Sequence, residues 1–121
     1  MGKPVRFQAR NAKPESDFKR AARRWMKLAY GPYIFQLSIA GGPYQRAGSP
    51  DDVFCIRSLF VAIEWKAPAE VAGRKPRIGP RQAEVIAEIL SAGGRAGAVS
   101  CWDELKELLV GIEPVQRGME L

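Results

Sequence analysis

Apolar residues recur along the chain in two spacings, one typical of helices and one typical of strands. These patterns predict a helix, three strands, a helix, a strand and a helix, over residues 14–30, 33–39, 51–57, 59–66, 80–91, 95–99 and 100–110. The order α-β-β-β-α-β-α, with a hairpin followed by a helical crossover, predicts an α/β fold with a mixed central sheet flanked by helices.

The chain is short enough to form one domain. We expect residues 14–112 to form this domain, between a basic arm at 1–13 and a loose tail at 113–121. We also expect Ser100 and Asp103 to form a capping box at the start of the last helix. No apolar run approaches the roughly 20 residues that span a bilayer, and no signal peptide is recognised, so we expect a cytoplasmic protein without a membrane partner.

The residue types present restrict the chemistry. The chain has no histidine, which excludes Ser-His-Asp and Cys-His catalysis and zinc hydrolases with histidine ligands. Cys55 and Cys101 lack the spacing of a zinc site and are expected to be buried thiols. Hydrolytic chemistry would therefore depend on carboxylates, lysine and a hard metal ion.

The strand at 59–66 carries an acid and a base on one face. Its alternating side chains place Leu59 and Trp65 on an entirely apolar face, and Glu64 and Lys66 together at the end of the other. A carboxylate and an ammonium group at the end of a buried strand are costly in desolvation unless they have a use. Glu64 and Lys66 are therefore candidate site residues.

A two-residue turn at Arg57-Ser58 would place Asp51 directly opposite Glu64, with Cβ atoms roughly 5 Å apart. Two carboxylates at this distance repel each other, and a bound Mg²⁺ would remove the repulsion. The cation would polarise a phosphate and acidify a water, while Lys66 would orient the water or neutralise developing charge. Asp52 falls on the apolar face in this register, although a shift of the turn by one residue would exchange the two aspartates.

Gln82 and Glu15 are further candidates on the two predicted helices. Each lies in a first turn, on the apolar stripe of its helix, where its side chain could reach the site. The alternative is that each is an exposed helix start, where glutamate is favoured by the helix dipole.

A net charge of +6 indicates a polyanionic partner such as DNA. Two groups of basic residues are candidates for phosphate contact, one on the first helix and one in and after the loop that follows Lys66. They comprise Lys19, Arg20, Arg23, Arg24 and Lys27, and Arg74, Lys75, Arg77 and Arg81. The alternative for both is an ordinary solvated surface.

The run Gly48-Ser49-Pro50-Asp51, followed by Glu64-Trp65-Lys66 and then by Gln82 at a helix start, resembles the VRR-NUC family of the PD-(D/E)XK nucleases. The resemblance covers about residues 14–110, and Asp52 departs from it where an apolar residue is expected. It implies a restriction-endonuclease-like core and Mg²⁺- or Mn²⁺-dependent hydrolysis of DNA. It also implies metal ligands from Asp51, Glu64, Glu15 and the backbone of Trp65, with Lys66 and Gln82 in the catalytic set.

The same resemblance implies a homodimer, like the Holliday-junction resolvases, acting on duplex or branched DNA in a bacterial or phage-infected cell. Two other interpretations remain open. The chain could be a DNA-binding protein of this fold without activity, although its acid–acid–lysine set is intact. It could also be a basic α/β domain in which Glu64 and Lys66 form a salt bridge.

Overall fold

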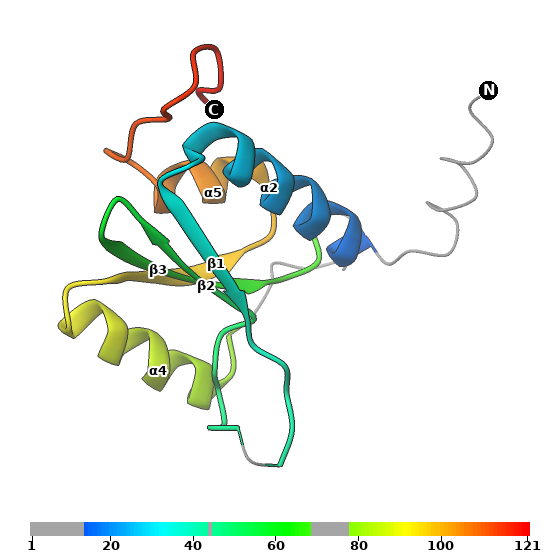
Figure 1. Cartoon of the computed structure of the whole chain (residues 1–121). Coiled ribbons are helices and arrows are strands. Elements are labelled where there is room, and N and C mark those ends of the chain that lie inside the picture. The colour runs from blue at the N-terminus through cyan, green and yellow to red at the C-terminus, as the bar shows by residue number, and fades with distance from the viewer. Residues whose placement is uncertain (1–13, 44, 69–77) are drawn as a thin grey trace.

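The chain forms a four-stranded mixed sheet with helices on both sides, in a computed structural model that describes residues 14–43, 45–68 and 78–121. The elements are α2 (Pro14–Tyr30), β1 (Ile34–Ser38), β2 (Asp52–Ile56), β3 (Leu59–Trp65), α4 (Pro80–Ser91), β4 (Arg95–Val99) and α5 (Trp102–Leu108). Helices α2 and α5 lie on one side of the sheet and α4 lies on the other (Figure 1). The predicted α/β class, element order and mixed sheet are confirmed.

The strands are arranged in the order β1-β2-β3-β4. Strands β1, β2 and β3 are antiparallel neighbours, and β4 pairs with β3 in parallel after the α4 crossover. The β2–β3 turn has positive φ at both Arg57 (50°) and Ser58 (72°), as a two-residue hairpin turn of type I′ requires. This turn pairs Ile56 with Leu59 and Asp52 with Ile63, which is the predicted register.

The main core lies between the sheet and the helices α2 and α5. Apolar residues of α2 fall on one stripe, so the helix buries that stripe against the sheet. Trp65 is buried on β3, and the ring of Phe18 meets it edge to face with centroids 5.8 Å apart. The buried cluster comprises Ala22, Met26, Ala29, Tyr30, Phe54, Ile56, Val61, Ile63, Trp65, Val99, Leu105 and Leu109.

The opposite face of the sheet is only partly covered. Helix α4 packs against β4, so the half of this face formed by β1 and β2 is not covered by it (Figure 1). Cys55 on β2 is consequently exposed, and Cys101 is half-buried. The expectation of two buried thiols was therefore wrong, and for Cys55 the reason is that α4 does not cover its half of the sheet.

After α5, the backbone N–H groups of Val115 and Gln116 donate hydrogen bonds to the carbonyl of Ala29. One expectation near the C-terminus needs correction. Ser100 does not pair with Asp103. Instead, its backbone N–H and hydroxyl both donate to Oε1 of Glu104, at 2.6 and 2.7 Å. None of the described helices is both long and apolar enough to cross a membrane.

Candidate active site

Asp51 directly precedes β2 and Glu64 lies on β3, at the same end of the β2–β3 hairpin. Asp52 pairs with Ile63, so the same register extended by one residue places Asp51 beside Glu64. Oδ2 of Asp51 accepts a hydrogen bond from the backbone N–H of Trp65 at 2.9 Å. The Asp51 carboxylate is thereby fixed against the backbone between Glu64 and Lys66.

The side chain of Lys66 contacts both Glu64 on β3 and Gln82 on α4. Its Nζ lies 3.7 Å from Oε2 of Glu64 and 3.3 Å from Oε1 of Gln82. The side chains of Lys66 and Glu64 are mostly buried, with 22% and 12% of their surfaces exposed. The structure therefore gathers Asp51, Glu64, Lys66 and Gln82 from separate segments into one cluster.

Gln82 makes two contacts at the start of α4. Its Oε1 accepts the backbone N–H of Gly79 at 3.0 Å, which satisfies one of the free donors at the start of α4. The same oxygen accepts from Lys66. The helix start and the lysine are thus held by a single amide, so capping α4 also positions Lys66.

Gly48 fixes the loop before β2 against the first turn of α4. Its φ is +83°, and a Cβ there would lie 2.4 Å from the carbonyl of Arg81 and 2.8 Å from the nitrogen of Gln82. Only glycine fits this close approach without strain. An ion pair between Arg46 and Glu88 joins the same loop to α4 further along. Asp51 directly follows this loop, so its position depends on the packing of the loop.

Asp52 occupies the other face of the sheet, fully buried among hydrogen-bond donors. Nε and Nη2 of Arg23 donate to its two oxygens at 2.7 and 2.8 Å, and Nε1 of Trp65 donates at 2.6 Å. The hydroxyl of Ser38 and the amide of Gln36 also donate, at 2.7 and 3.3 Å. The Asp52 carboxylate is thus already bound by donors in the core. Asp51 is therefore the better candidate for the aspartate that binds a ligand.

The buried position and the donors around Asp52 act on its pKa in opposite directions. Burial raises the pKa, but hydrogen bonds from Arg23, Trp65 and Ser38 outweigh burial and hold the pKa below its ordinary value. In the unfolded chain the carboxyl titrates near its ordinary pKa of about 3.9. Ionised Asp52 therefore contributes stability above that pH, and the contribution is lost as the pH falls through the lower folded value.

We expect the free energy of unfolding to fall below about pH 4 through protonation of Asp52. Urea unfolding of the wild type and of Asp52→Asn between pH 6 and pH 3 measures this dependence. The difference in stability between the two proteins should shrink as the pH decreases. A difference that stays constant across this range would show that Asp52 does not titrate with folding.

Among the residues predicted to contact DNA, Arg23 differs because its guanidinium makes hydrogen bonds within the fold. Its side chain is 29% exposed and its guanidinium binds Asp52 and Ser38, so its donors are engaged within the fold. Lys27 and Arg81 are exposed, and Lys19 is half-exposed.

Arg74, Lys75 and Arg77 lie outside the described residues. Glu15 lies in the first turn of α2, but its side chain is outside the described part of the chain.

The sequence patterns did not reveal the network around Asp52. Its partners come from α2, β1 and β3, 13 to 29 residues away in the chain. One feature of the sequence did point to the network. An aspartate on an otherwise apolar strand face needs hydrogen-bond donors, and Gln36 and Ser38 are polar positions on one face of the preceding strand. No local rule identifies Arg23 as a partner of Asp52.

The carboxylate pair is compatible with a hard cation. Asp51 and Glu64 offer the oxygen donors that Mg²⁺ and Mn²⁺ prefer, and Mg²⁺ is commonly held by one or two carboxylates while it keeps several waters. Among the side chains that the structure describes, no cluster of three or more Asp, Glu, Cys or His residues is present. The donor set therefore fits a hydrated Mg²⁺ better than a metal enclosed entirely by protein ligands.

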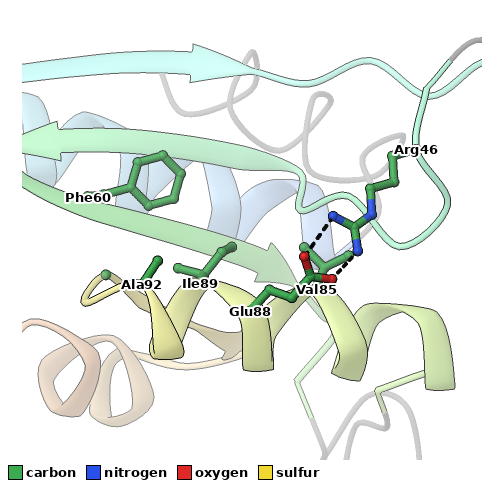
Figure 2. A pocket seen from close by; sticks show the side chains of 7 residues that line it. Arg46, Phe60, Val85, Glu88, Ile89 and Ala92 are labelled. Atoms are coloured by element: carbon green, nitrogen blue, oxygen red, sulfur yellow. Dashed lines mark hydrogen bonds and ion pairs between the residues drawn. The ribbon is translucent and has the colours of Figure 1, made fainter.

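A separate apolar pocket of about 340 Å³ lies between α4 and the β2–β3 hairpin. Phe60 faces Ile89 and Ala92 across it, and the ion pair of Arg46 with Glu88 closes one end (Figure 2). Neither carboxylate of the candidate site lines this pocket. The carboxylate of Glu88 at its end is paired with Arg46 and its other walls are mainly apolar, so we place the candidate active site at the acid–lysine cluster.

The cluster thus combines two carboxylates that can bind a cation, an ammonium group that can contact an anionic substrate, and an amide that fixes the ammonium group. These are the groups needed for metal-assisted hydrolysis of a phosphodiester. Comparison of the chain with protein-family models, with curated proteins and with solved structures gives no match.

Proposed function

We propose that the chain is a metal-dependent endonuclease that hydrolyses phosphodiester bonds in DNA, with a core of the PD-(D/E)XK type that resembles VRR-NUC domains. The observation that carries the proposal is the contact of Lys66 with Glu64 and Gln82 beside the Asp51 carboxylate. The net charge of +6 and the absence of histidine are in agreement with it.

Each residue of the cluster has a separate task in this proposal. Asp51 and Glu64 bind Mg²⁺ or Mn²⁺, with the backbone of Trp65 and the side chain of Glu15 as further proposed ligands. The cation, when bound, supplies Lewis-acid activation of the phosphate and of a water. Lys66 stabilises negative charge on the phosphate or orients the attacking water, and Gln82 holds its ammonium group in place.

The DNA would be held by basic side chains of two helices and of the loop after Lys66. Lys19 and Lys27 belong to α2, and Arg81 lies one residue before Gln82 on α4. Arg81 pairs with Glu84 at 3.3 Å, but both side chains are exposed, so a phosphate can compete with such a pair. Arg74, Lys75 and Arg77 are proposed as further contacts.

Cleavage assays with Lys66→Ala test the proposal. We expect the wild type to cut labelled DNA with Mg²⁺ or Mn²⁺ and not with EDTA. Loss of the ammonium group should reduce the rate about 100-fold, the usual effect of removing one charge-stabilising donor. A four-way junction and a linear duplex of matched sequence, compared side by side, identify the preferred DNA structure.

Lys106→Ala is the matched control, because Lys106 is an exposed lysine on α5 and should leave the rate unchanged. Failure of the wild type to cut either DNA with any metal would refute the nuclease. If DNA binding persisted in that case, a binding protein without activity would be the better interpretation. If binding were also absent, only the fold assignment would remain.

A further inference from the structure

Strand β1 forms one edge of the sheet and pairs only with β2 among the described strands. Arg57 N–H donates to the carbonyl of Tyr33 at 3.0 Å, and Ile39 N–H donates to the carbonyl of Asp51 at 2.8 Å. These bonds show that odd-numbered residues of this segment direct their peptide groups toward β2. The peptide groups of Ile34, Gln36 and Ser38, the even-numbered residues, therefore point toward the open edge.

The side chains of β1 make this edge unusually apolar. Phe35 is 63% exposed and Leu37 is 54% exposed, on the sheet face that α4 leaves uncovered. Edge strands are commonly protected from pairing by lysine, proline or a bulge. Strand β1 contains no charged residue and no proline, and its pairing with β2 is continuous over all five residues.

The arrangement of β1 is self-complementary about a two-fold axis through Gln36. In an antiparallel pair centred there, Gln36 faces Gln36 of the second copy, and Ile34 faces Ser38. All of these residues have outward peptide groups, so each facing pair can exchange two hydrogen bonds. Phe35 then faces Leu37 of the second copy at the non-hydrogen-bonded positions, where side chains approach most closely.

We infer that β1 pairs with β1 of a second copy of this chain, joining the two sheets into one continuous antiparallel interface. Such an interface is isologous, because the same strand serves both partners. Charge on the strand does not oppose a second copy. Although each chain carries a net charge of +6, the strand itself has none, so pairing places no like charges opposite each other on β1. This inference requires neither metal nor DNA and is independent of the proposed nuclease activity.

Sedimentation equilibrium of the wild type and of Leu37→Lys tests the interface at concentrations up to about 100 µM. We expect the wild type to have twice the mass of the chain and Leu37→Lys to have the mass of one chain. Lysine at this position places two like charges next to the two-fold axis, and exposure of Leu37 allows the fold to persist. Leu28→Lys is the matched control, because Leu28 is 55% exposed on α2 and should leave the dimer intact. A monomeric wild type, or a dimeric Leu37→Lys, would overturn the inference.

Disulfide cross-linking tests the register separately. Gln36→Cys, in a background of Cys55→Ser and Cys101→Ser, should form a covalent dimer on mild oxidation. Facing residues of a hydrogen-bonded pair have Cα atoms about 5.5 Å apart, within the range of a disulfide. Phe35→Cys is the control, since it faces Leu37 and should cross-link far less. Equal cross-linking of both variants, or none at Gln36→Cys, would refute pairing about Gln36.

Discussion

Replacing Asp52 with alanine should lower the free energy of unfolding by about 3–5 kcal/mol, the usual effect of removing one partner from a buried ion pair. The substitution leaves the guanidinium of Arg23 and the indole N–H of Trp65 without the carboxylate that both now bind. Their desolvation is then uncompensated. Because domains of this kind are stable by only about 5–15 kcal/mol, this one change would remove much of the total.

Urea unfolding at pH 7 measures this effect directly. Asp103→Ala is the control, because Asp103 is exposed on α5 and should change the stability by less than about 0.5 kcal/mol. A loss below about 1 kcal/mol for Asp52→Ala would mean that the network around Asp52 contributes little beyond what water supplies in the unfolded chain.

Changing the neighbouring aspartate should have the opposite consequence, with loss of activity and little loss of stability. For Asp51→Asn we expect DNA cleavage to fall by about 1,000-fold or more, because the amide removes the negative charge proposed to bind the cation. The asparagine oxygen can still accept the N–H of Trp65, so the local backbone should keep its position.

Initial cleavage rates over a range of Mn²⁺ concentrations, together with thermal unfolding, test this contrast. The rate should remain low even at high Mn²⁺, and the melting temperature should change little. Asp103→Asn provides the matched control for charge. Cleavage near the wild-type rate in Asp51→Asn would exclude Asp51 as a metal ligand. A large loss of stability would instead indicate a structural role.

The parts of the fold that were predicted from the sequence are those determined by local interactions. Pro80 and the glycines after Ser91 define α4, and both predicted ends agree with the structure. The two-residue turn at Arg57-Ser58 fixes the register of the hairpin, and that register alone places Asp51 beside Glu64 and Asp52 in the core. A period of two residues then assigns every side chain of β2 and β3 to a face.

The features that were missed depend on contacts between distant segments. Arg23 has the spacing of a surface residue on α2, and only the packing of α2 across β1 brings it to Asp52. Cys55 is on the face that helices were expected to cover, but α4 lies over β4, so the thiol is exposed. Hydrophobic periodicity indicates which face of an element is apolar, but it does not indicate how much of a sheet face a helix will cover.

Trp65 holds both aspartates, through its backbone N–H to Asp51 on one side of the sheet and through its indole N–H to Asp52 on the other. One residue therefore links the packed interior to the acidic cluster. A substitution that repacked the interior and shifted the backbone at Trp65 would also move the donor that holds the Asp51 carboxylate. The position of that carboxylate is consequently tied to the packing of the core.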